Sequence, residues 1–216
     1  MDPDFWRQRW SEGRIGFHQG APHGLLVRFA DAVLGSPARV LVPLCGKAVD
    51  LAWLAARGSS VVGVELVEDA ARAFFEEQQI PAQPTRDGPR VRWAGGSIEI
   101  VVGDFFEITH ADVGGFDAVY DRAALVALPG DLRARYVAHL RTLLDPGARV
   151  LLVAFAHDAP RDDPPFSVEE PEVRALWDGC AIRALADDDL TDRSEALRAR
   201  GATSVREQAW SIELPR

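Results

Sequence analysis

The chain has 216 residues, of which 47% are hydrophobic, so it is long enough to bury a substantial core, and we expect one domain over residues 1–216. Its formal net charge of −9 opposes phosphate neutralisation and favours a small-molecule partner over nucleic acid. Cys45 and Cys180 form no CxxC pair, and the sequence has neither a secretion signal nor an apolar run of about eighteen residues, which predicts a cytoplasmic protein without membrane contact.

The N-terminal segment, residues 1–35, is expected to cover the rest of the chain. It begins with an aromatic cluster that includes Trp6 and Trp10, and glycines punctuate the stretch on both sides of Phe17. Because glycine backbone changes conformation easily, rigid aromatic anchors joined by glycines are typical of a hinged cover. We therefore interpret Trp6 to Gln19 as a mobile lid.

Short apolar runs rich in β-branched residues follow in residues 36–216. They are Arg39–Pro43, Val61–Leu66, Ile98–Val102, Phe116–Tyr120 and Val150–Phe155. Continuous apolar runs are typical of parallel strands that are buried on both faces of a sheet. Helical patterns at Ala48–Arg57 and Val67–Gln79 separate the first three runs, and a further helix is expected from Asp131, as its N-cap, to Pro146-Gly147.

This alternation predicts an α/β fold with a doubly wound, mostly parallel sheet. Ligands of such sheets bind beyond the carboxyl ends of the strands. Val91–Ile100 is typical of a hairpin through Gly95-Gly96, whose outer strand is expected at an edge of the sheet. Further strand signals lie at Ala181–Leu185 and Ser204–Leu214.

The loop after the first strand contains Gly46, where backbone N–H groups can meet a nucleotide-like ligand. A single glycine in such a turn also fits plain backbone geometry. A phosphate-binding P-loop would need glycine and a hydroxyl residue where Leu41 and Ala48 stand, so an NTPase is excluded. The dinucleotide fingerprint GxGxxG is absent as well, which disfavours a nicotinamide-dependent oxidoreductase.

The second strand ends near Glu65, about twenty residues after Gly46, and this is the spacing at which an acid binds ribose hydroxyls. The alternative interpretation is an ordinary solvated glutamate. The position of Glu65 at the ligand-binding edge favours a cofactor that contains ribose.

Several blocks, taken in order, resemble the thiopurine S-methyltransferase family, and together they cover nearly the full chain. They are Trp6-Arg7-Gln8-Arg9-Trp10, the loop Pro43-Leu44-Cys45-Gly46-Lys47 with Asp50, Gly63-Val64-Glu65-Leu66, Tyr120-Asp121-Arg122-Ala123-Ala124-Leu125-Val126-Ala127-Leu128 and Pro164-Pro165-Phe166-Ser167-Val168. Asp163 departs from the pattern, because the family usually has glycine before the proline pair. The resemblance, which is to bacterial members, implies a seven-stranded, Rossmann-like class I S-adenosylmethionine-dependent methyltransferase fold with an N-terminal helical cover.

The resemblance also implies a set of cofactor contacts. They are Trp10, Leu44, Glu65 and Arg122, with Trp6, Phe17, Asp104 and Phe105 as further wall and the Gly46 backbone beside the methionine moiety. Phe105 is expected to pack on adenine, while Trp10 and Phe17 cover the sulfonium, whose charge is attracted to an aromatic face. The alternative for these aromatic side chains is ordinary core packing.

Arg122 is the candidate for positioning the methyl acceptor, and Arg206 is a second candidate implied by the resemblance. Asp121-Arg122 is either a structural ion pair or part of the active site. In-line methyl transfer needs alignment and desolvation rather than a covalent intermediate. No metal is expected, because the five histidines have no ligand spacing.

The resemblance implies methylation of aromatic or heterocyclic thiols by S-adenosylmethionine, with selenium and tellurium species as further acceptors. The alternatives are the same fold acting on another small acceptor and a cofactor-binding protein without activity. Asp163-Pro164-Pro165-Phe166 also resembles the motif of adenine-N6 methyltransferases, but it follows the fifth predicted strand instead of the fourth. A monomer is expected.

Overall fold

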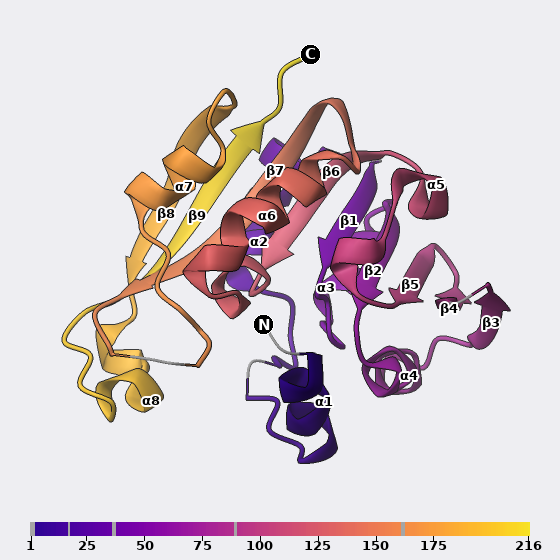
Figure 1. The fold of residues 1–216 in the computed structure, drawn as a ribbon, viewed down its shortest axis with the longest axis horizontal. Helices are drawn as coiled ribbons and strands as arrows, with labels where there is room; N and C mark the ends of the chain where they lie inside the picture. Colours follow the sequence, from indigo (N-terminus) through magenta and orange to yellow (C-terminus); the bar gives the residue numbers. More distant parts are fainter. Residues whose placement is uncertain (1–2, 17, 36–37, 89, 161–162) are drawn as a thin grey trace.

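The computed structural model describes residues 3–16, 18–35, 38–88, 90–160 and 163–216, and its centre is a nine-stranded sheet (Figure 1). The strands are β1 (Arg39–Pro43), β2 (Ser60–Glu65), β3 (Gln83–Asp87), β4 (Arg90–Gly95), β5 (Ile98–Val102), β6 (Phe116–Arg122), β7 (Leu144–His157), β8 (Ala181–Asp189) and β9 (Val205–Glu213). Their order is β3-β4-β5-β2-β1-β6-β7-β9-β8. Strands β5, β2, β1, β6 and β7 are mutually parallel, which confirms the predicted Rossmann-like, mostly parallel sheet.

Helices cover both faces of this sheet. The helices of the described chain are α1 (Pro3–Ser11), α2 (Gly24–Val33), α3 (Asp50–Ala56), α4 (Glu68–Glu77), α5 (His110–Val113), α6 (Gly130–Arg141), α7 (Glu170–Leu176) and α8 (Glu195–Arg198). Apolar side chains of α2, α3 and α4 pack on one face, and those of α6 and α7 pack on the other. The parallel core is therefore enclosed between two helical layers.

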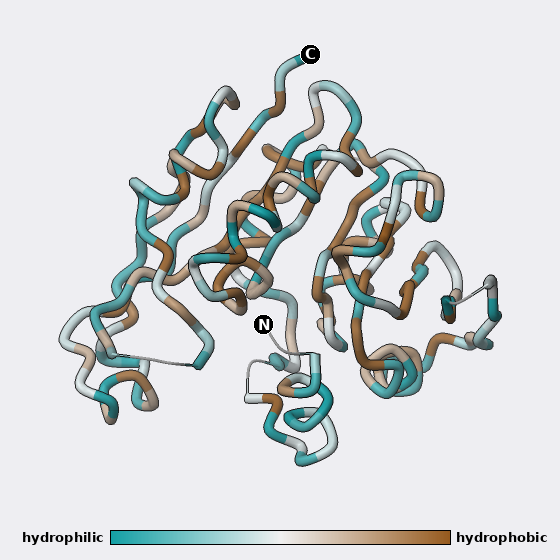
Figure 2. The backbone as a smooth tube through the Cα atoms, viewed as in Figure 1, coloured by the Kyte–Doolittle hydropathy of each residue, from teal (hydrophilic) through white to brown (hydrophobic). Residues whose placement is uncertain are grey.

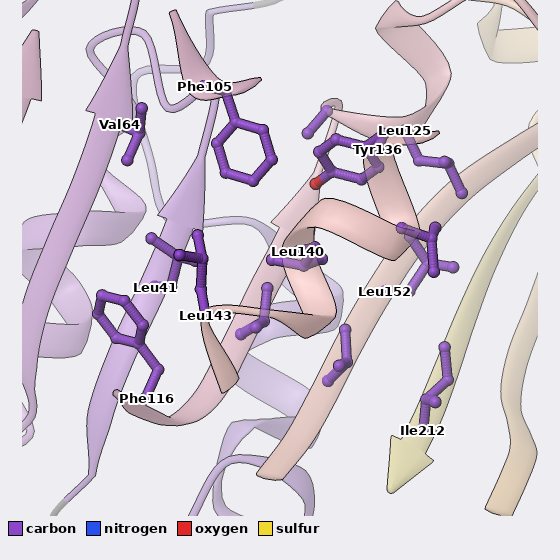
Figure 3. Packing of buried hydrophobic residues seen from close by; sticks show 14 of the residues in the cluster. Leu41, Val64, Phe105, Phe116, Leu125, Tyr136, Leu140, Leu143, Leu152 and Ile212 are labelled. Carbon is purple, nitrogen blue, oxygen red and sulfur yellow. The ribbon is translucent and has the colours of Figure 1, made fainter. Parts of the chain in front are cut away.

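Alternation along the strands explains why the central runs are apolar without a break. Leu41 of β1 belongs to the cluster beneath α6, whereas its neighbours Val40 and Val42 belong to the cluster beneath α2 and α3. Successive side chains of a strand point to opposite faces, so a strand covered on both faces needs apolar residues at every position. Figure 3 shows Leu41 on the same face as Tyr136 and Leu140 of α6.

The sheet has nine strands in the described residues, two more than the seven that the resemblance implies, and one of them, β3, had no strand signal in the sequence. Strand β3 pairs with β4 in antiparallel fashion, so β3 is the edge strand and β4 is not. Pro84 lies within β3. Proline has no N–H to donate, and strands accept it at an edge, where one side of the ladder is unpaired.

Helix α6 also differs from its prediction at both ends. Pro129 is its N-cap residue, and Asp131 lies in the first turn without capping it. The helix ends at Arg141, and Pro146-Gly147 lies within β7, where the Gly147 N–H donates to the Pro215 carbonyl at 3.0 Å. Pairing with the C-terminal segment therefore places Pro146-Gly147 in a strand, although the dipeptide is by itself a turn signal.

The N-terminal segment has two parts with different surroundings. Helix α2 buries Leu25, Leu26, Ala30 and Val33 against the sheet, whereas α1 has no buried residue. Figure 2 shows α1 mostly in hydrophilic colours, and Figure 1 shows it beyond the end of the sheet at which the parallel strands finish. Helix α1 thus has the position expected of a cover, and α2 belongs to the core. Within the described residues, no helix combines the length and apolar character needed to cross a membrane.

Candidate active site

A cavity of about 580 Å³ lies at the carboxyl ends of the parallel strands. The residues that follow β1, β2 and β5 line one end of it, and residues of β7 and the C-terminal third line the other. Arg122 at the end of β6 and the residues after it lie between, as the strand order requires. This volume suits a small-molecule ligand, and the location is the usual ligand site of such sheets.

The loop after β1 has an uncommon backbone conformation. Leu44 has a φ of 49° and Gly46 a φ of 54°, and only the second residue adopts this region without strain. The Cys45 N–H donates to the Val64 carbonyl at 3.0 Å, which ties the loop to β2. A Cβ atom at Gly63 would lie 2.6 Å from the Cys45 Sγ, so glycine is needed there for the close approach.

Glu65 joins this loop to the end of β2. Its Oε2 accepts a hydrogen bond from the Gly46 N–H and its Oε1 accepts one from the Val67 N–H, both at 2.8 Å. The side chain is buried, and burial raises the pKa of its carboxyl. The Gly46 N–H is therefore directed at Glu65. Each carboxylate oxygen has a second lone pair, so Glu65 can still accept from a ligand in the cavity that it lines.

Asp104 and Phe105 line the same end of the cavity after β5. The Asp104 carboxylate accepts from the Phe106 N–H at 2.9 Å and so caps the 3-10 turn Phe105–Glu107. The Phe105 ring is buried, with its centroid 5.2 Å from that of Tyr136 (Figure 3). This packing fixes an aromatic wall beside Glu65.

Asp121 and Arg122 at the end of β6 have different surroundings. The Asp121 carboxylate is buried and accepts from the Tyr136 hydroxyl at 2.8 Å and the Leu125 N–H at 3.2 Å. Burial raises the pKa of Asp121 to about 6. Arg122, by contrast, lines the cavity. Asp121 therefore holds α6 and the loop after β6 in place, whereas Arg122 is placed where it can contact a ligand.

The cover supplies the wall opposite the sheet. Pro3, Trp6, Arg9, Trp10, Gly16 and Gln19 line the cavity. The Trp6 and Trp10 side chains are half-buried, although α1 buries no residue fully. The predicted core-packing alternative therefore does not describe these two side chains. Phe17 lies outside the described residues.

The C-terminal third contributes cavity residues that sequence analysis did not assign. They are Phe155, Pro164, Pro165, Ser194, Ala196, Leu197 and Arg200. Arg206, the second acceptor candidate, is not among the lining residues; its Nε donates to Asp187 Oδ1 at 2.7 Å, and this contact raises the pKa of Arg206. The proline pair was visible as a motif, but no spacing signal pointed to Arg200.

A metal site is not apparent in the part of the chain that the structure describes. No group of three or more histidine, cysteine, aspartate or glutamate side chains there is arranged to hold an ion.

The sheet order and the cavity at its carboxyl ends define the class I S-adenosylmethionine-dependent methyltransferase fold. The chain resembles the crystal structure of Burkholderia thailandensis 1,6-didemethyltoxoflavin-N1-methyltransferase, which contains 1,6-didemethyltoxoflavin and S-adenosylhomocysteine. The TM-score is 0.67 at 20% sequence identity, over 99% of this chain and 87% of that one. This likeness concerns the fold.

Sequence comparison identifies the family. The family model described as Thiopurine S-methyltransferase (TPMT) matches residues 1–214. Thiopurine S-methyltransferase of Pseudomonas fluorescens (strain Pf0-1) is 43% identical over 98% of this chain and 99% of the relative, and that of Azotobacter vinelandii is 43% identical over 99% of each. The chain belongs to the thiopurine S-methyltransferase family and is a methyltransferase, as the resemblance predicted.

Proposed function

We propose that the protein transfers the methyl group of S-adenosylmethionine to the sulfur of aromatic or heterocyclic thiols. S-adenosylmethionine is the methyl donor of the class to which the chain belongs. The observation that carries the proposal is a single cavity lined by both Glu65, on the cofactor side, and Arg122, at the centre. The site therefore has room for a donor and an acceptor in contact.

The proposed cofactor contacts follow the geometry of the lining residues. Glu65 accepts hydrogen bonds from ribose hydroxyls through its remaining lone pairs, because the Gly46 and Val67 N–H groups hold it in place. Phe105 packs on the adenine, and Asp104 lies next to it. Leu44 and Trp10 face the methionine part, with the Trp10 ring available to a sulfonium.

Arg122 is proposed to position the acceptor. Its planar guanidinium can hold an anionic heterocycle in a fixed orientation, with the sulfur directed at the methyl group. In the transfer, the thiolate sulfur forms a bond to the methyl carbon as the carbon–sulfonium bond breaks, and the products are two neutral thioethers. The apolar walls exclude water from a step in which both charges disappear, which is where desolvation favours the reaction.

An acceptor screen with labelled S-adenosylmethionine tests the proposal. Thiopurines, aromatic thiols, selenite and tellurite are the acceptors, and we expect methylation of at least one aromatic or heterocyclic thiol. Arg122→Ala should lose this activity but retain S-adenosylhomocysteine binding. Cofactor binding without turnover on any acceptor would support a non-catalytic protein, and turnover on a different class alone would support the other alternative.

We also propose that the chain is one domain, monomeric and cytoplasmic. In support of a monomer, Val27 is the one large apolar side chain that is exposed among the described residues. Cys45 and Cys180 form no disulfide. Light scattering after size exclusion should give the mass of one chain.

A further inference from the structure

Three charged side chains from distant parts of the sequence, Arg9, Asp163 and Arg200, meet beside the cavity, and the two arginines line it. Arg9 belongs to α1, Asp163 precedes the proline pair, and Arg200 follows α8. The Arg200 Nη1 donates to Asp163 Oδ1 at 2.8 Å, and the Arg9 Nη1 lies 3.7 Å from Asp163 Oδ2. One carboxylate is thus placed between two guanidinium groups.

Arg9 is held by further contacts. Its Nε donates to the Arg14 carbonyl at 3.4 Å, and its guanidinium carbon lies 5.2 Å from the centre of the Phe5 ring. Arg9 and Arg200 both line the cavity. Their side chains are 20% and 50% exposed, so they lie at its mouth and remain partly in contact with water.

Counted by themselves, these three described side chains carry one net positive charge, because two guanidinium groups contact one carboxylate. The nearby wall is apolar, with Phe155, Pro164 and Leu197. Apolar walls lower the local dielectric and so strengthen the attraction of a guanidinium for a negative group. Arg9 and Arg200 line the same cavity as Arg122, so an acceptor held at Arg122 can reach this positive charge with its other side.

We propose that Arg9 and Arg200 are specificity-determining residues that favour acceptors with a negative charge, such as a carboxylate, remote from the reacting sulfur. Asp163 is a positioning residue that sets the separation of the two arginines and limits their net charge. This inference rests on the proposed thiol methylation and adds the charge of the acceptor. It also assigns a role to Asp163, which stands where the family usually has glycine before the proline pair.

Two acceptors with the same ring and the same sulfur position isolate the effect. We compare kcat/KM for 4-mercaptobenzoate with kcat/KM for 4-methylbenzenethiol and follow the ratio of the two values in each variant. Arg200→Gln and Arg9→Gln should each lower the ratio by about fivefold, the effect of one exposed ion pair. Asp163→Asn should raise it by about fivefold, since it removes the opposing charge.

Arg198→Gln is the matched control, because Arg198 is an exposed arginine of α8 that does not line the cavity. Its ratio should equal that of the wild type. The opposite signs expected for the arginine and aspartate variants separate charge selection from a structural role, which would change both acceptors alike. Equal losses on both acceptors, or a lower ratio in Asp163→Asn, would overturn the inference.

The proposed function is judged by the full acceptor screen, so a wild type that methylates neither of these two thiols does not by itself refute it. The arginine pair is then tested by calorimetric titration of 4-mercaptobenzoate into the protein saturated with S-adenosylhomocysteine. We expect Arg200→Gln to bind this probe about fivefold more weakly than the wild type and the Arg198→Gln control. Equal affinities would overturn the inference on this readout as well.

Discussion

Replacing Glu65 with glutamine measures how closely the cofactor site is coupled to the fold around it. The residue is 6% exposed, and its carboxylate accepts from the Gly46 and Val67 N–H groups at 2.8 Å each. Glutamine has the same shape but one acceptor oxygen, so its amide nitrogen must face one of the two backbone donors. That donor then loses its partner in a buried position.

Loss of one buried hydrogen-bond partner costs about 1–3 kcal/mol. The raised pKa of Glu65 shows that burial already disfavours its charge, and removing the charge offsets part of this cost. We therefore expect the free energy of unfolding to fall by about 1 kcal/mol. Loss of a charge-assisted hydrogen bond from ribose should raise the Kd for S-adenosylhomocysteine by about tenfold to a hundredfold.

Urea unfolding and titration calorimetry measure these two quantities separately. Glu99→Gln is a suitable control, because Glu99 lies on the neighbouring strand β5, pairs with Arg92 at 2.6 Å and does not line the cavity. It should change stability without changing affinity. If Glu65→Gln lowered stability and left the Kd unchanged, the ribose role would be refuted and Glu65 would be a structural residue.

Three further predictions concern the fold and the acceptor. Burial raises the pKa of Asp121 from 3.8 to about 6, so the folded state binds this proton more tightly than the unfolded state. The free energy of unfolding should therefore fall by about 3 kcal/mol as pH rises through that range. Asp121→Asn should remove this fall in urea titrations between about pH 4 and 7, and an unchanged pH profile would contradict the prediction. Arg122→Lys keeps the charge but loses the planar fork, so thiol kcat/KM should drop by about tenfold with little change in Tm, and wild-type turnover would exclude a positioning role. Gly63→Ala should destabilise the fold by about 1–3 kcal/mol because the new Cβ meets the Cys45 Sγ, and a stability equal to that of the wild type would show that the loop can move away.

The central strands were predictable because burial on both faces requires an unbroken run of apolar residues. Strands β1 and β5 have the predicted bounds, and β2, β6 and β7 differ only at their ends. Strand β3 has no apolar run, since its residues are polar and include Pro84. Pairing with β4 creates this strand, and pairing partners are not visible in local composition.

The same contrast applies to the candidate site. Glu65 was predictable because it follows an apolar strand of a parallel sheet, whose carboxyl ends converge, whereas Leu44 and Phe105 were implied by the family resemblance. All three line the cavity. Arg200 follows the short helix α8 in a segment without periodicity, and nothing in its spacing relates it to Arg9. Only the folded chain brings those two side chains together on Asp163.

The placement of α1 has a consequence for the order in which the protein is completed during synthesis. Helix α1 leaves the ribosome before the strands of the sheet, yet the Asp163 carboxylate that pairs with Arg9, and the Arg200 that holds this carboxylate, emerge much later. Since α1 buries no residue of its own, it has no core to join in the meantime. The nascent chain can assemble its cofactor-side strands early, but the mouth of the cavity is finished only after Arg200 has been released.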